Sequence, residues 1–375
     1  MMNIRNNLVN SKIVLFIFSL FILGVIVEIL IHHYDQTRVL YKRLKADNEY
    51  VYEKIDPKFL KVDPYSLVSV KTLADLRQTR ARLIEVFWGE AQFPAEVQPA
   101  AVEHDVSVEA FGDLPNLSRI DRIVVDMGHE VRSKLLYFRP VETGNGNLVI
   151  YHHGFAGSIE DVPHIIGAFL ERGYSVLAID LLNYGGAKSK YKTSKNEAGF
   201  NLHFELDKIP TPLRYHLEPV VVGLNHALRD SDYGSVSMVG FSAGAFVTTA
   251  IAAVDPRILH SYLIAGVYPI YLRTGQDIQI GMPSYYPPML EVANYLDLFV
   301  LGAAGAGRRQ LQIFNRYDRC CYNNTKGKLY EPAVAETVGL IGDGGEFMVL
   351  IDETHADHKP SQFAVEAILA DMARL

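Results

Sequence analysis

Gly240-Phe241-Ser242-Ala243-Gly244 is the stretch of this chain that decides its fold. It follows a β-favouring run, residues 236–239, and precedes a run of small residues, 245–254, that favours a helix. A Gly-x-Ser-x-Gly sequence between a strand and a helix is typical of a nucleophile elbow, a turn so tight that its glycine positions leave almost no room for a side chain. We therefore predict that Ser242 projects from a strand end as a nucleophile. The alternative is a glycine-rich turn with a structural serine.

Strands and helices alternate on both sides of this turn. The pattern predicts strands at 120–125, 133–138, 147–151, 174–180, 236–239, 260–264, 311–314 and 346–351. Helices are predicted between them and at the C-terminus, at 160–171, 212–229, 245–254 and 361–374. The first two strands form an antiparallel pair. Strands separated by helices imply right-handed crossovers, so we expect an α/β fold with a mostly parallel sheet and helices on both faces.

A serine hydroxyl is a weak nucleophile at neutral pH, so Ser242 needs a histidine base and an acid that orients it. The candidate acid is Asp318, which lies just beyond the strand 311–314. Sites in open α/β folds assemble at the carboxyl ends of the strands, which favours this position. Asp352 and Asp343 are the competing acids.

The candidate base lies in the segment 352–361, between the last strand and the last helix. We prefer His358 because it immediately precedes the helix, where the loop turns back across the sheet, and His355 remains the alternative. A His-x-x-His pair also occurs in metal sites, but no matching set of Cys or Glu ligands accompanies this one. We expect neither a metal nor an organic cofactor.

Backbone amides must receive the negative charge that develops on the attacked carbonyl oxygen. One donor is predicted at Ala243, which follows the nucleophile at a helix N-terminus, where the helix dipole favours an anion. The second is predicted at Phe155, in the segment His152-His153-Gly154-Phe155-Ala156-Gly157 that follows the strand 147–151. Gly154 permits the unusual backbone conformation that such a loop requires.

The segment 151–155, the elbow, Asp318 and His358 together resemble the α/β-hydrolase superfamily, over about residues 119–375. The resemblance implies an eight-stranded sheet, a triad of Ser242, Asp318 and His358, and chemistry through an acyl-enzyme. It implies no particular substrate, because this fold hosts many activities.

The N-terminus carries an apolar run, residues 13–31, interrupted only near its end by Glu28. Its roughly 19 residues are about the length that spans a bilayer as a helix. The first alanine after the run is Ala46, so no small-residue cleavage site follows, and we predict an uncleaved signal anchor. A buried helix of a soluble domain is the alternative. Positive charges flank both ends almost equally, and we expect the domain on the non-cytoplasmic face, periplasmic or extracellular, as in the usual export arrangement.

The predicted organisation is a short tail at 1–12, the anchor at 13–31, a stalk at 32–100 and the hydrolase domain at 101–375. The stalk region includes a helix near 72–87 that is predicted to pack on the domain. The long connection 267–310 is predicted to form a cap over the serine, and a structural helix is its alternative.

The net charge is −7, with 36 Lys and Arg against 43 Asp and Glu, which argues against nucleic-acid binding. The chain has 2 cysteines, Cys320 and Cys321, which form a disulfide in an oxidising compartment or stay as buried thiols.

These features predict a membrane-anchored serine hydrolase that cleaves a carboxylic ester of a small molecule, lipid or glycan. An acyltransferase or an amidase would use the same residues. A catalytically silent binding module of the same fold is a second alternative, and an interaction protein acting through residues 34–100 is a third. The sequence leaves the oligomeric state open.

Overall fold

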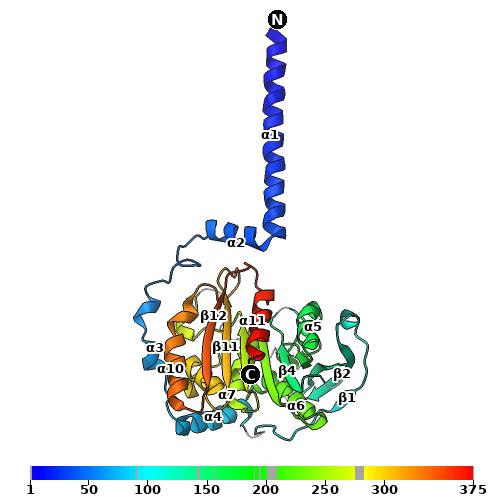
Figure 1. Cartoon of the computed structure of the whole chain (residues 1–375), viewed down its shortest axis with the longest axis vertical. Coiled ribbons are helices and arrows are strands. Elements are labelled where there is room, and N and C mark those ends of the chain that lie inside the picture. Colours follow the sequence, from blue (N-terminus) through cyan, green and yellow to red (C-terminus); the bar gives the residue numbers. More distant parts are fainter. Residues whose placement is uncertain are drawn as a thin grey trace.

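The computed structural model describes residues 2–89, 92–141, 144–155, 157–189, 191–193, 196–200, 209–274 and 283–374, without the side chains of 2–11, 32 and 188–200. Figure 1 shows a long N-terminal helix, α1 (Met2–His33), that projects away from a compact body. A second helix, α2 (Asp35–Leu44), turns across the end of α1 and faces the body.

Within the described part of the chain, α1 is the one helix long and apolar enough to cross a membrane, over Lys12–Ile31. None of this segment is buried against the rest of the protein, and large apolar side chains such as Phe16 and Phe21 are about two-thirds exposed, at 65% and 68%. A signal sequence near the N-terminus has the same length and composition as such a span.

The body is built on one sheet with the strand order β1-β2-β3-β5-β4-β9-β10-β11-β12, and β6 pairs with β3. The strands β5, β4, β9, β10, β11 and β12 pair with one another in parallel. The pairs β1–β2, β2–β3, β3–β5 and β3–β6 are antiparallel. A separate pair is formed by β7 (Tyr191–Thr193) and β8 (Asn196–Phe200). The strands of the main sheet are β1 (Ala101–Glu103), β2 (Leu117–Asp126), β3 (Val131–Pro140), β4 (Asn147–His152), β5 (Ser175–Ile179), β6 (Lys188–Ser189), β9 (Ser235–Phe241), β10 (His260–Ile264), β11 (Arg309–Asn315) and β12 (Glu346–Asp352).

All eight predicted strands are present, but over the residues that the structure describes the sheet has ten strands rather than eight. The two additional strands, β1 and β6, are only three and two residues long. Such short strands carry no apolar run or alternation from which a sequence pattern could predict them.

Helices cover both faces of the sheet, as predicted. Alternate residues of each central strand point to opposite faces. In β4, for example, Leu148 and Ile150 join the larger core cluster, whereas Val149 and Tyr151 join the smaller one. The larger cluster receives α4 (Leu73–Trp88), α6 (Arg214–Asp230), α7 (Ala243–Val254), α9 (Tyr295–Ala303) and α10 (Glu331–Ile341), and the smaller one receives α5 (Pro163–Glu171) and α11 (Gln362–Met372).

The packing crosses the boundary expected at residue 101. Leu76, Leu83, Phe87 and Trp88 of α4 are buried in the same core cluster as α6 and α7. A capping box between Thr72 and Asp75 fixes the start of α4. Residues from η1 (Phe59–Lys61) onward are therefore part of the domain core, and α3 (Pro64–Leu67) lies between η1 and α4.

The connection 267–310 differs from the expected cap. It contains η6 (Ile270–Leu272), α8 (Pro287–Val292) and α9, and every residue of α9 is buried. Because α9 packs on α7, β11 and β12, it belongs to the helical layer on the sheet and does not lie over the serine. Residues 275–282 of the expected cap lie outside the described residues.

Candidate active site

The elbow holds Ser242 in a conformation that few residues adopt. Ser242 lies between β9 and α7 with φ 55° and ψ −117°, and its amide donates to the Ile264 carbonyl at 2.8 Å. A Cβ on Gly240 would lie 2.2 Å from the Gly244 carbonyl oxygen, and a Cβ on Gly244 would lie 2.2 Å from that of His152. A strained residue of this kind costs about 1–3 kcal/mol, and the surrounding contacts must hold it in place.

The structure brings Ser242, His358 and Asp318 into one hydrogen-bonded line. The Nε2 atom of His358 lies 2.7 Å from the Ser242 Oγ, and the Nδ1 atom lies 2.6 Å from Oδ2 of Asp318. The three residues follow the carboxyl ends of β9, β12 and β11, respectively. The His358 ring also packs on the Phe241 ring, with the centroids 4.9 Å apart, which fixes the plane of the imidazole.

The Asp318 carboxylate is buried and its second oxygen is also engaged. Oδ1 accepts hydrogen bonds from the backbone amides of Cys320 at 2.7 Å and Cys321 at 3.2 Å. The Asn323 side chain donates to the Asp318 carbonyl at 3.0 Å. These bonds orient the carboxylate so that Oδ2 faces the imidazole, where it favours the tautomer with a proton on Nδ1.

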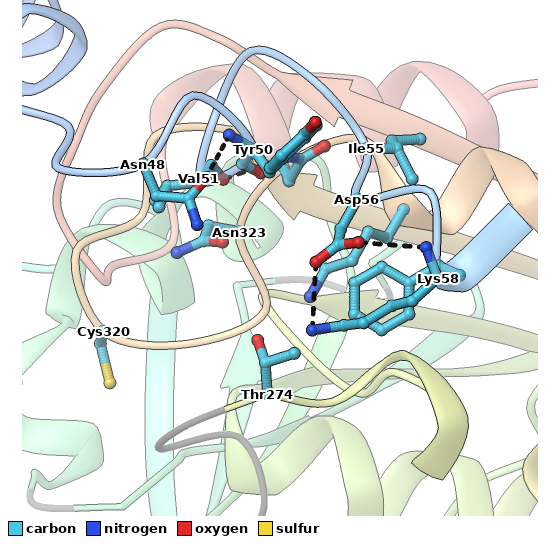
Figure 2. Close-up of a pocket in the computed structure, with 12 residues that line it drawn as sticks. Asn48, Tyr50, Val51, Ile55, Asp56, Lys58, Thr274, Cys320 and Asn323 are labelled. Atoms are coloured by element: carbon cyan, nitrogen blue, oxygen red, sulfur yellow. Dashed lines mark hydrogen bonds and ion pairs between the residues drawn. The ribbon is translucent and has the colours of Figure 1, made fainter.

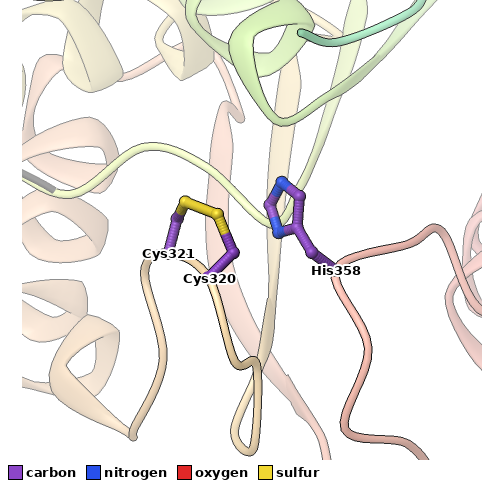
Figure 3. Close-up of side chains that lie close together, drawn as sticks. All are labelled: Cys320, Cys321 and His358. Atoms are coloured by element: carbon purple, nitrogen blue, oxygen red, sulfur yellow. A yellow bond between two sulfur atoms is a disulfide. The ribbon is translucent and has the colours of Figure 1, made fainter. Parts of the chain in front are cut away.

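Cys320 and Cys321 form a disulfide, with the sulfur atoms 2.11 Å apart. Figure 3 shows this disulfide beside the His358 ring, and the two sulfurs and a ring nitrogen lie within 4.8 Å of one another. Because the thiolate is the form of cysteine that ligates a metal, the oxidised pair offers no ligand. The disulfide instead forms part of the wall around the imidazole.

The competing candidates lie elsewhere. His355 is buried, and its Nε2 lies 3.3 Å from Oδ2 of Asp352, so it faces that carboxylate. Burial raises the pKa of Asp352, but hydrogen bonds from His355, Ser361 and Thr354 outweigh it and hold this pKa below its ordinary value. Ser361 also caps α11 by accepting from the Ala364 amide at 3.0 Å. This cluster therefore ties the end of β12 to the start of α11.

The third candidate acid, Asp343, is exposed in a turn after α10. It lies before β12 begins, at the amino edge of this strand, whereas the three aligned residues follow the carboxyl ends of their strands. Of the three acids considered, only Asp318 therefore contacts the imidazole of His358.

The loop after β4 lies against the nucleophile. A Cβ on Gly154 would lie 2.8 Å from the Cβ of Ser242 and 2.7 Å from the Phe241 carbonyl oxygen, so only glycine fits there. The next residue, Phe155, is 39% exposed and its ring packs edge-on against Tyr184 at 4.9 Å. Ala243, the other predicted donor, is the first residue of α7, whose first-turn amides have no partner within the helix. Ala156 lies outside the described residues.

Two buried histidines support this loop, and the sequence did not reveal their part in it. Burial lowers the pKa of His152 to about 4, and its Nδ1 pairs with the His153 carbonyl oxygen at 2.8 Å. Burial also lowers the pKa of His153, whose Nδ1 lies 3.1 Å from the Tyr151 hydroxyl. Both rings are thus neutral at pH 7 and hold the backbone that leads to Gly154 and Phe155.

The stalk was the least expected neighbour of the site. Arg38 of α2 pairs with Asp357 at 2.5 Å, and Lys359 pairs with Asp35 at 3.3 Å, so α2 binds both residues that flank His358. The paired residues are more than 300 positions apart in the chain. No local pattern in the sequence could have signalled these contacts.

The stalk also binds the loop that carries the acid. The Asn324 side chain donates to the carbonyls of Val51 at 3.1 Å and Lys54 at 2.7 Å, and Arg316 donates to that of Tyr52 at 3.0 Å. Tyr52 packs edge-on against Tyr317, with the ring centroids 5.9 Å apart. The segment expected to be a stalk is therefore part of the structure that holds Asp318.

Between the stalk and the acid loop lies a cavity of about 260 Å³, shown in Figure 2. Its walls carry mostly polar side chains, and Cys320 of the disulfide contributes to it. The stalk side is ordered by Asp56, which accepts from the Lys58 amide at 3.0 Å and pairs with the Lys58 ammonium at 3.2 Å. The cavity is lined by Asn48, Tyr50, Val51, Ile55, Asp56, Lys58, Phe59, Thr274, Cys320, Asn323, Asn324 and Lys326.

Comparisons with known proteins agree on the fold. Residues 147–280, which include Phe155, Ser242 and Ala243, match the family described as alpha/beta hydrolase fold. No curated protein matches the chain. The chain therefore has the α/β-hydrolase fold, and the resemblance identified from its sequence is confirmed.

Solved structures with a similar fold include several esterases. An acetyl xylan esterase from Paenibacillus sp. R4 is 15% identical with a TM-score of 0.56, and the match covers 83% of this chain and 98% of that one. A glucuronoyl esterase from Solibacter usitatus is 13% identical with a TM-score of 0.56 and the same coverage of 83% and 98%. A methylesterase is 14% identical with a TM-score of 0.55, over 87% of this chain and 66% of the methylesterase. At these identities the likeness concerns the fold.

Proposed function

We propose that this protein is a serine hydrolase that cleaves carboxylic esters, with Ser242 as nucleophile, His358 as base and Asp318 as the orienting acid. The observation that carries the proposal is the continuous line of hydrogen bonds, 2.7 Å from Ser242 to His358 and 2.6 Å from His358 to Asp318. The first distance is within the range in which a base can take a proton from the nucleophile, and the second is that of a hydrogen bond that orients the base. The α/β-hydrolase fold supports the same assignment.

In the first half of the reaction, the Ser242 Oγ attacks the ester carbonyl and its proton passes to Nε2 of His358. The negative oxygen is received by the amides of Ala243 and Phe155, and Asp318 stabilises the imidazolium. His358 then gives its proton to the departing alkoxide as the carbonyl–oxygen bond breaks. The alcohol leaves, and the acyl group stays on Ser242.

In the second half, His358 takes a proton from water as that water attacks the acyl carbon. The bond to the Ser242 Oγ breaks, and the serine oxygen takes the proton back from His358. A carboxylic acid is released and the site returns to its first state. Proton transfer by a positioned base contributes about 10²–10⁴-fold to a rate of this kind.

We further propose that α1 anchors the protein in a membrane as a single span, with the domain on the non-cytoplasmic face. The exposed apolar segment Lys12–Ile31 supports the anchor. The Cys320–Cys321 disulfide supports the location, because disulfides persist in oxidising compartments and are rare in the cytosol. The first probes are esters of small molecules and glycans, since two similar structures are named acetyl xylan esterase and glucuronoyl esterase.

The test is turnover of p-nitrophenyl acetate together with labelling by a fluorophosphonate, which reacts with activated serines. Ser242→Ala should abolish both. Ser235→Ala is the matched control, because Ser235 lies at the amino end of the same strand and bonds to Asn147 at 2.8 Å. A wild-type protein that shows neither labelling nor turnover would refute the enzyme and leave the silent binding module. Adding an alcohol or amine acceptor and analysing the products separates hydrolysis from acyl transfer, and matched amide substrates test amidase activity.

A further inference from the structure

The path of the chain between α1 and α2 fixes where α2 lies. The apolar segment ends at Ile31, α1 ends at His33, and Tyr34 is extended, with φ −120° and ψ 116°. α2 starts at Asp35, so at most about 14 Å of chain separates it from the end of the apolar segment. If α1 spans a bilayer, α2 must lie at the surface of that bilayer.

The two sides of α2 differ. The side that faces the body carries Asp35, Arg38 and Val39, which pair with or pack against the loops after β11 and β12. The outward side carries Leu40 and Leu44, which are 54% and 78% exposed. They are four residues apart, so they lie one above the other on a single helix face.

Basic residues accompany these exposed leucines. Lys42 and Lys45 lie in or next to the last turn of α2, whereas Arg43 pairs with Glu53 of the stalk at 2.7 Å. A helix with exposed leucines beside lysines is typical of one that rests in the headgroup region of a bilayer, where anionic lipids attract the basic side chains.

The inward side of α2 holds the catalytic edge of the sheet. Arg38 and Asp35 pair with the two neighbours of His358, and the following stalk residues bind the acid loop. Figure 1 shows that the loops after β11 and β12 lie on the side of the body that faces α2 and the end of α1. The edge that carries Ser242, Asp318 and His358 is therefore directed toward the base of the anchor.

We propose that α2 is an interfacial helix that lies on the lipid bilayer and holds the edge bearing Ser242 toward it, so that the substrates are amphiphilic esters presented at the membrane surface. The proposal rests on the proposed esterase activity and on the proposed anchor. The cavity in Figure 2 fits this arrangement, because one of its walls is built by the stalk that joins α2 to the core. A lipid surface is favoured over a protein partner because α2 continues directly from the apolar segment.

The orientation is tested without activity, by quenching of tryptophan fluorescence with brominated phosphatidylcholine. The full chain, reconstituted in vesicles of phosphatidylcholine and phosphatidylglycerol, has one tryptophan, Trp88, which is buried in α4 at the end of the body opposite α1 (Figure 1). In Leu40→Trp, the new indole would lie about 5–10 Å into the boundary of headgroups and acyl chains, and its emission should fall at least about twofold. Leu340→Trp is the control, because Leu340 is 84% exposed near the end of α10, before β12 begins.

Quenching of Leu40→Trp alone supports the orientation. Equal quenching of both variants, or no quenching of either, overturns it; the second result includes the case in which another protein covers the outward side of α2.

The substrate class is tested by combining Leu40→Glu and Leu44→Glu with a flexible Gly/Ser segment of about 20 residues inserted between His33 and Tyr34, which removes the exposed leucines of α2 and gives the body roughly 25 Å of free reach. The insertion variant keeps the triad and the contacts of α2 with the body, so turnover of soluble p-nitrophenyl acetate should stay unchanged. Turnover of a long-chain fluorogenic ester embedded in the same vesicles should fall about tenfold, because the site is no longer held at the surface.

Two results would overturn the inferred substrate class while leaving the esterase activity intact. One is a wild-type protein that hydrolyses the soluble ester but not the embedded one. The other is an insertion variant that hydrolyses both as fast as the wild type. If the wild type hydrolyses neither ester, the proposed function itself fails and the substrate class fails with it, and the quenching measurement still decides the orientation.

Discussion

Replacing Asp318 by asparagine tests how the active site is organised, because either orientation of the new amide leaves a conflict. The carboxylate now accepts from His358 through Oδ2 and from the amides of Cys320 and Cys321 through Oδ1. If the asparagine oxygen faces His358, its NH₂ group faces two N–H donors. If the NH₂ group faces His358, Nδ1 must become the acceptor, and the proton moves to Nε2.

The second orientation is the less costly, because it leaves the backbone amides paired. It also removes the lone pair on Nε2 that would take the proton of Ser242, 2.7 Å away. In the serine protease template, the same exchange of acid for amide lowers kcat by about 10⁴. We therefore expect kcat/KM of Asp318→Asn to fall by about 10³–10⁴, which is about 4–5.5 kcal/mol of transition-state stabilisation.

The assay is initial-rate hydrolysis of p-nitrophenyl acetate at pH 7, with circular dichroism and thermal unfolding to show that the variant folds. Asp343→Asn is the matched control, because Asp343 is exposed, has a positive φ of 63° that asparagine tolerates, and lies away from the imidazole. A folded Asp318→Asn protein that loses less than about tenfold in kcat/KM would refute the reasoning, since the acid would then have no part in holding the tautomer.

Three further predictions follow from the loop and the histidines around the site. Gly154→Ala should lower kcat by about 10²-fold, because the new Cβ displaces the loop from the nucleophile, whereas Gly339→Ala, with open space around it, should keep full activity. His358→Ala should abolish fluorophosphonate labelling, while His355→Ala should keep it and lower the free energy of unfolding by about 1–3 kcal/mol in urea titrations; the reverse pattern of labelling would reassign the base. Burial lowers the pKa of His152 to about 4, so the unfolded state binds a proton more tightly than the folded state does. The free energy of unfolding therefore keeps the full contribution of His152 above pH 6.5 and loses about 3 kcal/mol as the pH falls to 4. His152→Gln should flatten this slope in urea titrations at pH 7, 5.5 and 4, and an unchanged slope would contradict the assignment.

Most of the fold could be predicted because its signals are local. The run around Ser242 and the apolar strands carry their pattern within a few residues, and all eight predicted strands are present. The two short strands, β1 and β6, and the position of α9 on the sheet could not be predicted, because no local signal distinguishes them. A strand of two or three residues has no periodicity, and a helix that is apolar on all sides reads alike whether it covers a sheet or a pocket.

The candidate site was predictable in its residue types and chain order but not in all its contacts. Ser242, Asp318 and His358 each follow a predicted strand, and parallel strands bring their carboxyl ends to one edge. The structure separates His358 from His355, because only His358 reaches the serine while His355 faces Asp352. The choice between the two depends on how the loop after β12 folds, which no spacing in the sequence fixes.

The sequence by itself determined the elbow around Ser242, the mostly parallel sheet and the apolar N-terminal helix, because backbone sterics and hydrophobic periodicity act between near neighbours. Only the tertiary structure decided that residues 35–59 bind the loops that carry His358 and Asp318. The pairs Arg38–Asp357 and Lys359–Asp35 join residues more than 300 positions apart. Such pairs form only after the sheet has brought its strand ends together, so their partners are set by the folded geometry.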